Sequence, residues 1–275
     1  MHKDLVSAFD KMVQILKQDS RCKGGWHFGS FGRGQTDDYS DYDVVFLVAD
    51  KDFESFADDV PTLMTEISDE LLLCWAEDFN NDYFKNFCNA FRIGSDIHQL
   101  DFFISNHDYQ DDYMCRFHRK GCTRENIIFD RTGETAALLD KDCDIGNHYP
   151  DTVRCIDTYW FHAFMLIKYF KRSDIFKIIK NIDILFHAHV DLLLSRYDRL
   201  DWSGWESKVK HCVPIEKQEH LKVYFTIADT ASLENAFKSG IALFKDDADE
   251  ICRYKNITYS ESAVQKISSY IEKML

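Results

Sequence analysis

The run Val44-Val45-Phe46-Leu47-Val48 constrains the fold more than any other stretch of the chain. It is apolar at every position and rich in β-branched residues, and an aspartate lies close to each of its ends. An apolar run of this length is typical of a strand that is buried on both faces. The run therefore predicts a central strand of a sheet.

Patterns on either side of this run indicate that the first half of the chain contains both helices and strands. Leu5, Phe9, Met12 and Leu16 recur at helical spacing and predict an amphipathic helix over residues 4–18. The other elements expected in this half are a helix over residues 52–68 and strands over residues 26–28, 71–75, 90–93 and 99–104.

The pattern changes near Asp151, after which long segments carry dense apolar residues at helical spacing. Asn147-His148-Tyr149-Pro150 is a plausible joint, because the residue before a proline disfavours helix. Helices are expected over residues 159–170, 175–194, 216–228, 231–246 and 260–274. The predicted fold class is α+β, with a mixed sheet flanked by helices over residues 1–150 and a helical bundle over residues 151–275.

The net charge and the cysteine content limit which binding partners and which cellular compartment are expected for the protein. The net charge is -14 and no dense Lys/Arg run occurs, which argues against long polynucleotides and anionic membranes as partners. No apolar run approaches the ~20 residues of a membrane span. The 9 cysteines are odd in number and lack a Cys-x-x-Cys pair, which favours reduced thiols in a cytoplasmic protein. A homodimer remains open, because core and interface look alike in the apolar helical half.

The glycine-rich segment Gly29-Ser30-Phe31-Gly32-Arg33-Gly34 is the first part of a chemical motif. Its glycines allow backbone N–H groups to turn toward a ligand and form a phosphate-binding nest, and Ser30 adds a hydroxyl there. Asp41 and Asp43 follow at the start of the central strand. Because residues two apart in a strand point to the same side, both carboxylates are expected to converge, as a Mg²⁺ site requires.

A third carboxylate, Asp101, interrupts the apolar segment 97–104. A buried carboxylate needs a partner, and a metal would supply one. The alternative is that Asp101 faces solvent from an edge strand. Gly29-Ser30 alone would be an ordinary turn, and a lone Asp-x-Asp is usually solvated, so the prediction depends on the ordered combination.

Gly29-Ser30, then Tyr39-Ser40-Asp41-Tyr42-Asp43, then Asp101 in a later strand resembles the polymerase-β-like nucleotidyltransferase superfamily. Within it, the motif looks like the antibiotic nucleotidyltransferases of the aminoglycoside 6-adenylyltransferase and lincosamide type. These pair the catalytic domain with a C-terminal helical domain of similar size. The motif match covers residues 25–48 well and residues 97–104 moderately.

The resemblance implies roles for these residues. Gly29 and Ser30 would hold the phosphates of a nucleoside triphosphate, and Asp41 and Asp43 would ligate Mg²⁺, with two ions expected. Asp101 would complete the metal site, accept the proton of the acceptor hydroxyl, or do both.

Two basic residues are further candidates for the triphosphate. Lys168 is the one cation in the apolar stretch 161–170, where the resemblance places a phosphate-binding residue on the first long helix of the second domain. It could equally be a lysine on a helix rim with its charge in water. Arg33 could contact phosphate or merely cover the glycine turn.

The resemblance implies transfer of a nucleoside monophosphate, AMP from ATP, to a hydroxyl of a small molecule, with release of pyrophosphate. An aminoglycoside- or lincosamide-like antibiotic is the implied acceptor, and the acidic balance favours the polycationic aminoglycosides. The alternatives are nucleotidylation of a partner protein and a nucleotide-binding module that has lost activity. His187-x-His189 with Asp191 resembles a metal site, but helix residues two apart do not face one another. Only His187 and Asp191 share a face, so they are interpreted as a polar patch on an interhelical surface.

Overall fold

The computed structural model describes residues 2–37, 39–141, 143–145, 151–200 and 204–275. Within it the chain divides into two compact units, Met1–Gly146 and Asn147–Leu275. The expected joint at residues 147–150 lies outside the described residues. The predicted α+β class is confirmed, since a mixed sheet with flanking helices is followed by helices alone.

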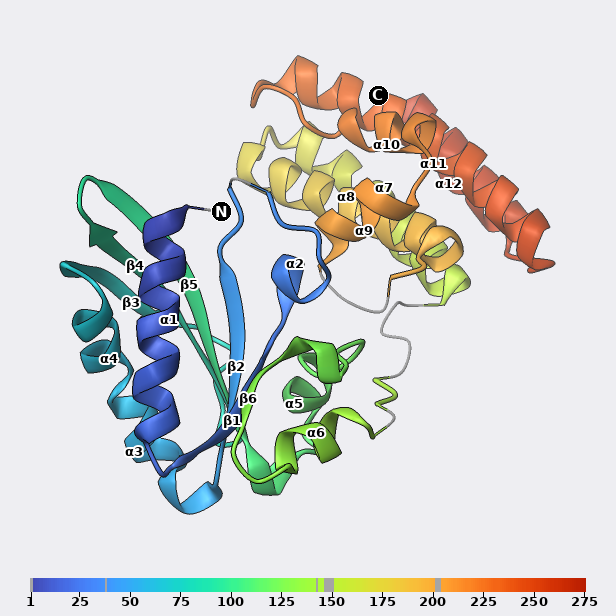
Figure 1. The fold of residues 1–275 in the computed structure, drawn as a ribbon. Helices are drawn as coiled ribbons and strands as arrows, with labels where there is room; N and C mark the ends of the chain where they lie inside the picture. Colours follow the sequence, from blue (N-terminus) through green and yellow to red (C-terminus); the bar gives the residue numbers. More distant parts are fainter. Residues whose placement is uncertain (1, 38, 142, 146–150, 201–203) are drawn as a thin grey trace. The chain divides into compact units, whose positions relative to one another are not determined.

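The first unit is built on a six-stranded sheet in the order β3-β4-β5-β2-β1-β6 (Figure 1). β2 and β5 run parallel, and the other neighbouring strands pair antiparallel. The strands are β1 (Cys22–His27), β2 (Tyr42–Val48), β3 (Glu70–Ala76), β4 (Phe84–Ile93), β5 (Asp96–Asn106) and β6 (Ile127–Asp130). The α-helices are α1 (Lys3–Gln18), α2 (Gly29–Gly32), α3 (Phe53–Asp58), α4 (Val60–Ile67), α5 (Tyr113–Phe117) and α6 (Glu134–Leu139).

Helices cover the two faces of this sheet differently. α1, α3 and α4 lie on one face, where α1 buries the apolar stripe predicted from its spacing (Figure 1). α5 and α6 lie on the other face and pack against Trp26, Val45 and Phe103. β2 is therefore buried on both faces along Val44–Val48, as its continuous apolar run predicts.

Three expectations for this unit need correction. The helix expected over residues 52–68 is interrupted at Asp59, with Pro61 in the first turn of α4, where a missing N–H is tolerated. β4 begins at Phe84 rather than near residue 90. Its first half lacks the pattern of an apolar strand, because the buried positions 86 and 89 are occupied by asparagine. β6 was not expected at all, since four half-buried residues give no clear period.

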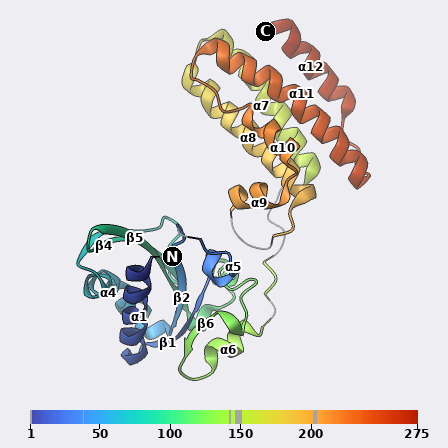
Figure 2. The same cartoon turned by 45° about the horizontal axis from the view of Figure 1, so that its top comes forward.

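The second unit is helical throughout its regular structure. α7 packs against α8, α11 and α12 (Figure 2). In its core the rings of Tyr159 and Phe244 stack with centroids 3.6 Å apart. The segment expected as one helix over residues 216–228 is helical only to Lys222, and α9 was not expected. The helices are α7 (Thr152–Lys171), α8 (Ile175–Tyr197), α9 (Trp205–Cys212), α10 (Ile215–Lys222), α11 (Thr230–Lys255) and α12 (Glu261–Met274).

Two further features bear on the sequence expectations. Among the described residues, no helix combines the length and apolar character needed to cross a membrane. All 9 cysteines are free thiols.

Candidate active site

The turn after β1 is held directly against Asp43. Gly29 has a φ of +54°, a left-handed conformation that residues with a Cβ rarely adopt. A Cβ at Gly29 would also lie 1.7 Å from Asp43 Oδ2. The Phe28 N–H donates a hydrogen bond of 2.9 Å to the Asp43 carbonyl oxygen. Glycine is therefore needed at this position for both its conformation and its lack of a side chain.

Ser30 follows in α2, a helix of a single turn, and is partly buried. Its carbonyl oxygen accepts a hydrogen bond of 3.0 Å from the Gln35 N–H. Within the described part of the chain, its hydroxyl makes no hydrogen bond. The first N–H groups of a helix lack intrahelical acceptors, and beside a left-handed residue they form a concavity suited to anions. The turn thus offers a hydroxyl and N–H groups to a phosphate.

The two aspartates of the motif flank Tyr42, the first residue of β2. Tyr42 is buried against α1, and its ring stacks on that of Phe9 at 4.1 Å. Alternation in β2 then places Asp43 on the opposite side. Asp41 directly precedes the strand, and its charge raises the pKa of both Asp43 and Asp101. Asp101 of β5 lies directly opposite Asp43 in the parallel pairing. The structure therefore brings the three carboxylates to one region of the sheet.

The electrostatics of this region show unbalanced negative charge. Burial, and then the charges of Asp41 and Asp101, raise the pKa of Asp43 to about 7, against an opposing effect of Arg33. Burial, and to a smaller extent Asp41, also raises the pKa of Asp101, while a hydrogen bond of 3.3 Å from Gln99 Nε2 acts in the opposite direction. A nearby cation would lower these pKa values and favour the ionised forms.

The donor set suits a hard divalent cation, because it consists of carboxylate oxygens on neighbouring strands. The carboxylate oxygens of Asp41, Asp43 and Asp101 do not all lie within 4.8 Å of one another. Among the described residues, the group that meets this distance is His2, Asp4 and Asp96, which are all exposed. Binding of Mg²⁺ by Asp41, Asp43 and Asp101 would therefore require side-chain rotations.

The same face continues across β4 and β3, which the sequence analysis did not include in the site. Cys88 lies directly opposite Asp101, and Trp75 lies directly opposite Cys88. Cys88 Sγ is 3.5 Å from Glu77 Oε1. Burial and the charge of Asp101 raise the pKa of Cys88 to about 12, so the thiol stays protonated and can donate to a carboxylate. The sequence alone contained little indication that these residues belong to the site, because their position beside Asp101 depends on the register of the strands.

The two candidate phosphate-binding cations lie in different units. Arg33 Nη1 donates a hydrogen bond of 2.9 Å to the Gly29 carbonyl oxygen, and the guanidinium lies 5.2 Å from the centroid of the Phe28 ring. Arg33 thus covers the glycine turn. Lys168 is exposed on α7 of the second unit, with Nζ 5.0 Å from the centroid of the Tyr169 ring.

The sequence profile of the streptomycin adenylyltransferase family matches residues 5–274. The chain belongs to this family. The expected nucleotidyltransferase class and the antibiotic-type resemblance are thereby confirmed. Among solved structures, an aminoglycoside 6-adenyltransferase from Bacillus subtilis is similar over 100% of this chain and 99% of that chain, at 14% sequence identity and a TM-score of 0.45. No curated protein matches the chain.

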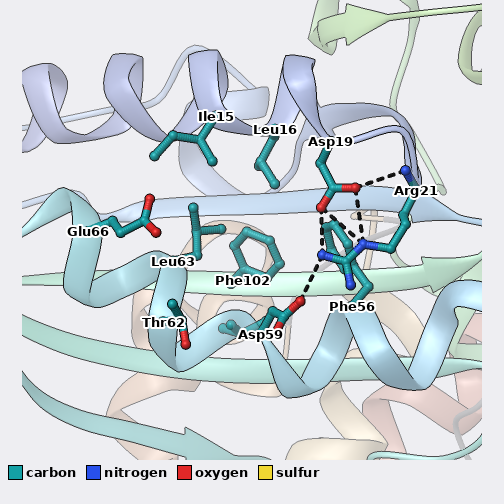
Figure 3. A pocket seen from close by; sticks show the side chains of 11 residues that line it. Ile15, Leu16, Asp19, Arg21, Phe56, Asp59, Thr62, Leu63, Glu66 and Phe102 are labelled. Atoms are coloured by element: carbon teal, nitrogen blue, oxygen red, sulfur yellow. Dashed lines mark hydrogen bonds and ion pairs between the residues drawn. The ribbon is translucent and has the colours of Figure 1, made fainter.

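Several cavities of the enzyme lie outside the carboxylate region, and two of them border elements that carry the motif. One cavity of about 240 Å³ lies beside Phe102, on the face covered by α1, α3 and α4 (Figure 3). At this cavity Arg21 forms ion pairs with Asp19 at 2.7 Å and with Asp59 at 2.8 Å. Another of about 500 Å³ borders the glycine turn and is lined partly by His27. Burial lowers the pKa of His27 to about 4, so its ring is neutral at neutral pH.

The helical unit of the enzyme contains a buried polar network that sequence reasoning missed. Asp247 is fully buried and accepts from Lys217 Nζ at 2.5 Å. It also bonds His189 and His220, each at 2.8 Å. His189 is therefore a core residue. His187, which was expected to share a polar patch with Asp191, has its Nε2 atom 3.6 Å from Asp183 Oδ1.

Proposed function

We propose that the enzyme transfers AMP from ATP to a hydroxyl group of a polycationic aminoglycoside-like antibiotic and releases pyrophosphate. The observation that carries this proposal is the packing of the Gly29–Ser30 turn on Asp43, which itself lies opposite Asp101. Family membership supports adenylyl transfer. Residues 1–150 would form the catalytic domain, and residues 151–275 would contribute acceptor binding.

The roles follow from the chemistry of each side chain. The Ser30 hydroxyl and the N–H groups of its turn would bind the triphosphate. Asp41, Asp43 and Asp101 would hold Mg²⁺, which supplies positive charge against the charge developing on the phosphate oxygens. Asp101 can also accept the proton of the acceptor hydroxyl. The oxygen of that hydroxyl then bonds to the α-phosphorus as the bond from the α-phosphorus to pyrophosphate breaks.

Lys168 would add a contact to the triphosphate. Its exposure and its place beside Tyr169 leave the ammonium accessible to a ligand. In Lys168→Gln we expect a higher KM for ATP and an unchanged KM for the acceptor. Equal KM values for ATP in the variant and the wild type would remove Lys168 from the site.

The acceptor class rests on charge. A net charge of -14 and the carboxylates on the sheet face away from α1 favour a polycation over a singly charged lincosamide. The test is incubation of the enzyme with Mg²⁺ and ATP labelled at the α-phosphate, against streptomycin, other aminoglycosides, a lincosamide and co-expressed proteins. We expect label on an aminoglycoside.

The controls are matched for charge. Asp43→Asn and Asp101→Asn should abolish transfer, whereas Asp58→Asn, which removes an exposed carboxylate of α3, should leave it unchanged. Label that appears only on a protein would favour protein nucleotidylation. If no acceptor takes up label although ATP binds, the chain is a nucleotide-binding module.

A further inference from the structure

A row of directly paired residues crosses four strands beside the proposed reaction centre. Trp75 of β3 lies opposite Cys88 of β4, Cys88 opposite Asp101 of β5, and Asp101 opposite Asp43 of β2. Directly paired residues project from the same face of a sheet. Trp75 therefore shares the face of Asp43 and Asp101, on the side away from α1.

At the β3 end of this row, the side chain of Trp75 is exposed on the surface of the first unit. Trp75 is 56% exposed, whereas Trp26, on the same face beneath α5 and α6, is fully buried. An exposed indole beside a reaction centre offers the π-face that cationic groups bind most strongly.

Glu77 adds an uncompensated negative charge to the same face. It lies two residues after Trp75, and its Oε1 is 3.5 Å from Cys88 Sγ. Across the described ranges of the chain, no lysine, arginine or histidine forms an ion pair with Glu77. Glu70, the first residue of β3, is instead paired with Arg92 at 3.1 Å. Glu77 is thus available to a cation from outside the chain, and Glu70 is not.

We propose that Trp75 and Glu77 form a subsite that binds a cationic amino or guanidino group of the acceptor and so selects the hydroxyl presented to Asp101. The inference rests on the proposed function, because it assumes an acceptor at Asp101. Two strand spacings separate the backbones of β3 and β5, so the cation would lie about 10 Å from the reacting hydroxyl. This separation matches a molecule of two or three linked rings with a charged substituent on one and a reactive hydroxyl on another.

The subsite predicts a specific pattern of binding constants. Calorimetry with streptomycin should give a Kd in Glu77→Gln that is about 10-fold higher than in the wild type, equivalent to about 1.4 kcal/mol. Trp75→Leu should weaken binding by a similar factor, and Trp75→Phe should restore part of it because a π-face remains. The matched control Glu70→Gln should bind as the wild type does. KM for ATP should not change in any of these variants.

The outcomes separate this subsite from the proposed function. Transfer to streptomycin with an unchanged Kd and KM in Glu77→Gln and Trp75→Leu would overturn the subsite and leave the function standing. Binding that depends on Glu77 without any AMP transfer would support the subsite and contradict the function. Absence of streptomycin binding to the wild type would overturn the subsite. A wild-type dimer that Trp75→Leu converts to a monomer, with streptomycin affinity unchanged, would assign this face to a second copy of the chain and also overturn it.

Discussion

Replacing Gly29 by alanine places a methyl group where the Asp43 carboxylate lies. The new Cβ would be 1.7 Å from Asp43 Oδ2 and 2.9 Å from Asp43 Cβ. Since real Cβ contacts are essentially never shorter than 3.0 Å, the carboxylate oxygen must move by about 1.3 Å. A misplacement of about 1 Å in a catalytic group can reduce the rate about 100-fold. We therefore expect kcat for AMP transfer to fall about 100-fold in Gly29→Ala.

The matched control is Gly133→Ala. Gly133 has a φ of +82°, so alanine is strained there as at Gly29, but nothing lies within 4 Å of its added Cβ. Backbone strain of about 1 kcal/mol should lower the free energy of unfolding in both variants, measured by urea denaturation. Pyrophosphate release with ATP and streptomycin then reports the rate. A kcat in Gly29→Ala that equals that of Gly133→Ala would refute the argument that the turn positions Asp43.

Three further predictions concern stability, measured by urea denaturation. Asp247→Asn should lower the free energy of unfolding by about 1–3 kcal/mol, because His189, His220 and Lys217 lose a charged acceptor in the core, although Lys217 keeps its ion pair with Glu250 at 2.6 Å. Burial alone would raise the pKa of Asp247, but its hydrogen bonds lower the pKa to about 2. The ionised form therefore contributes about 2 kcal/mol to the free energy of unfolding above pH 4, and this contribution should be lost as the pH falls toward 2. Asp247→Asn should lack that part of the acid dependence. Gly240→Ala should destabilise the protein despite the higher helix propensity of alanine, because its Cβ would lie 2.7 Å from the Tyr224 ring; a stability gain would contradict this packing.

The spacing of apolar residues along the sequence predicted the first helix and the central strand correctly. The helical stripe from Leu5 to Leu16 and the apolar run of β2 appear as expected, since each buries its side chains through its own spacing. Alternation also predicted that Asp43 projects from the face opposite Tyr42, whose ring stacks on Phe9 of α1. The interruption near Pro61 was readable in principle, because proline favours the first turn of a helix.

Features that depend on contacts between distant segments could not be predicted in this way. Trp75 and Cys88 come beside Asp101 only through the registers of β3, β4 and β5, which no local pattern specifies. The bond between His189 and Asp247 joins residues 58 positions apart. A histidine on an apolar helix gives no sign of which distant carboxylate will be its hydrogen-bond partner.

The central claim is that Asp43, with its neighbours, forms a metal and triphosphate site. The most direct measurement is the shift in Tm on adding a non-hydrolysable ATP analogue with Mg²⁺, compared with the analogue alone. We expect a Mg²⁺-dependent rise in Tm for the wild type and Asp58→Asn that is lost in Asp43→Asn. An equal rise without Mg²⁺, or an undiminished rise in Asp43→Asn, would contradict a metal and triphosphate site at Asp43.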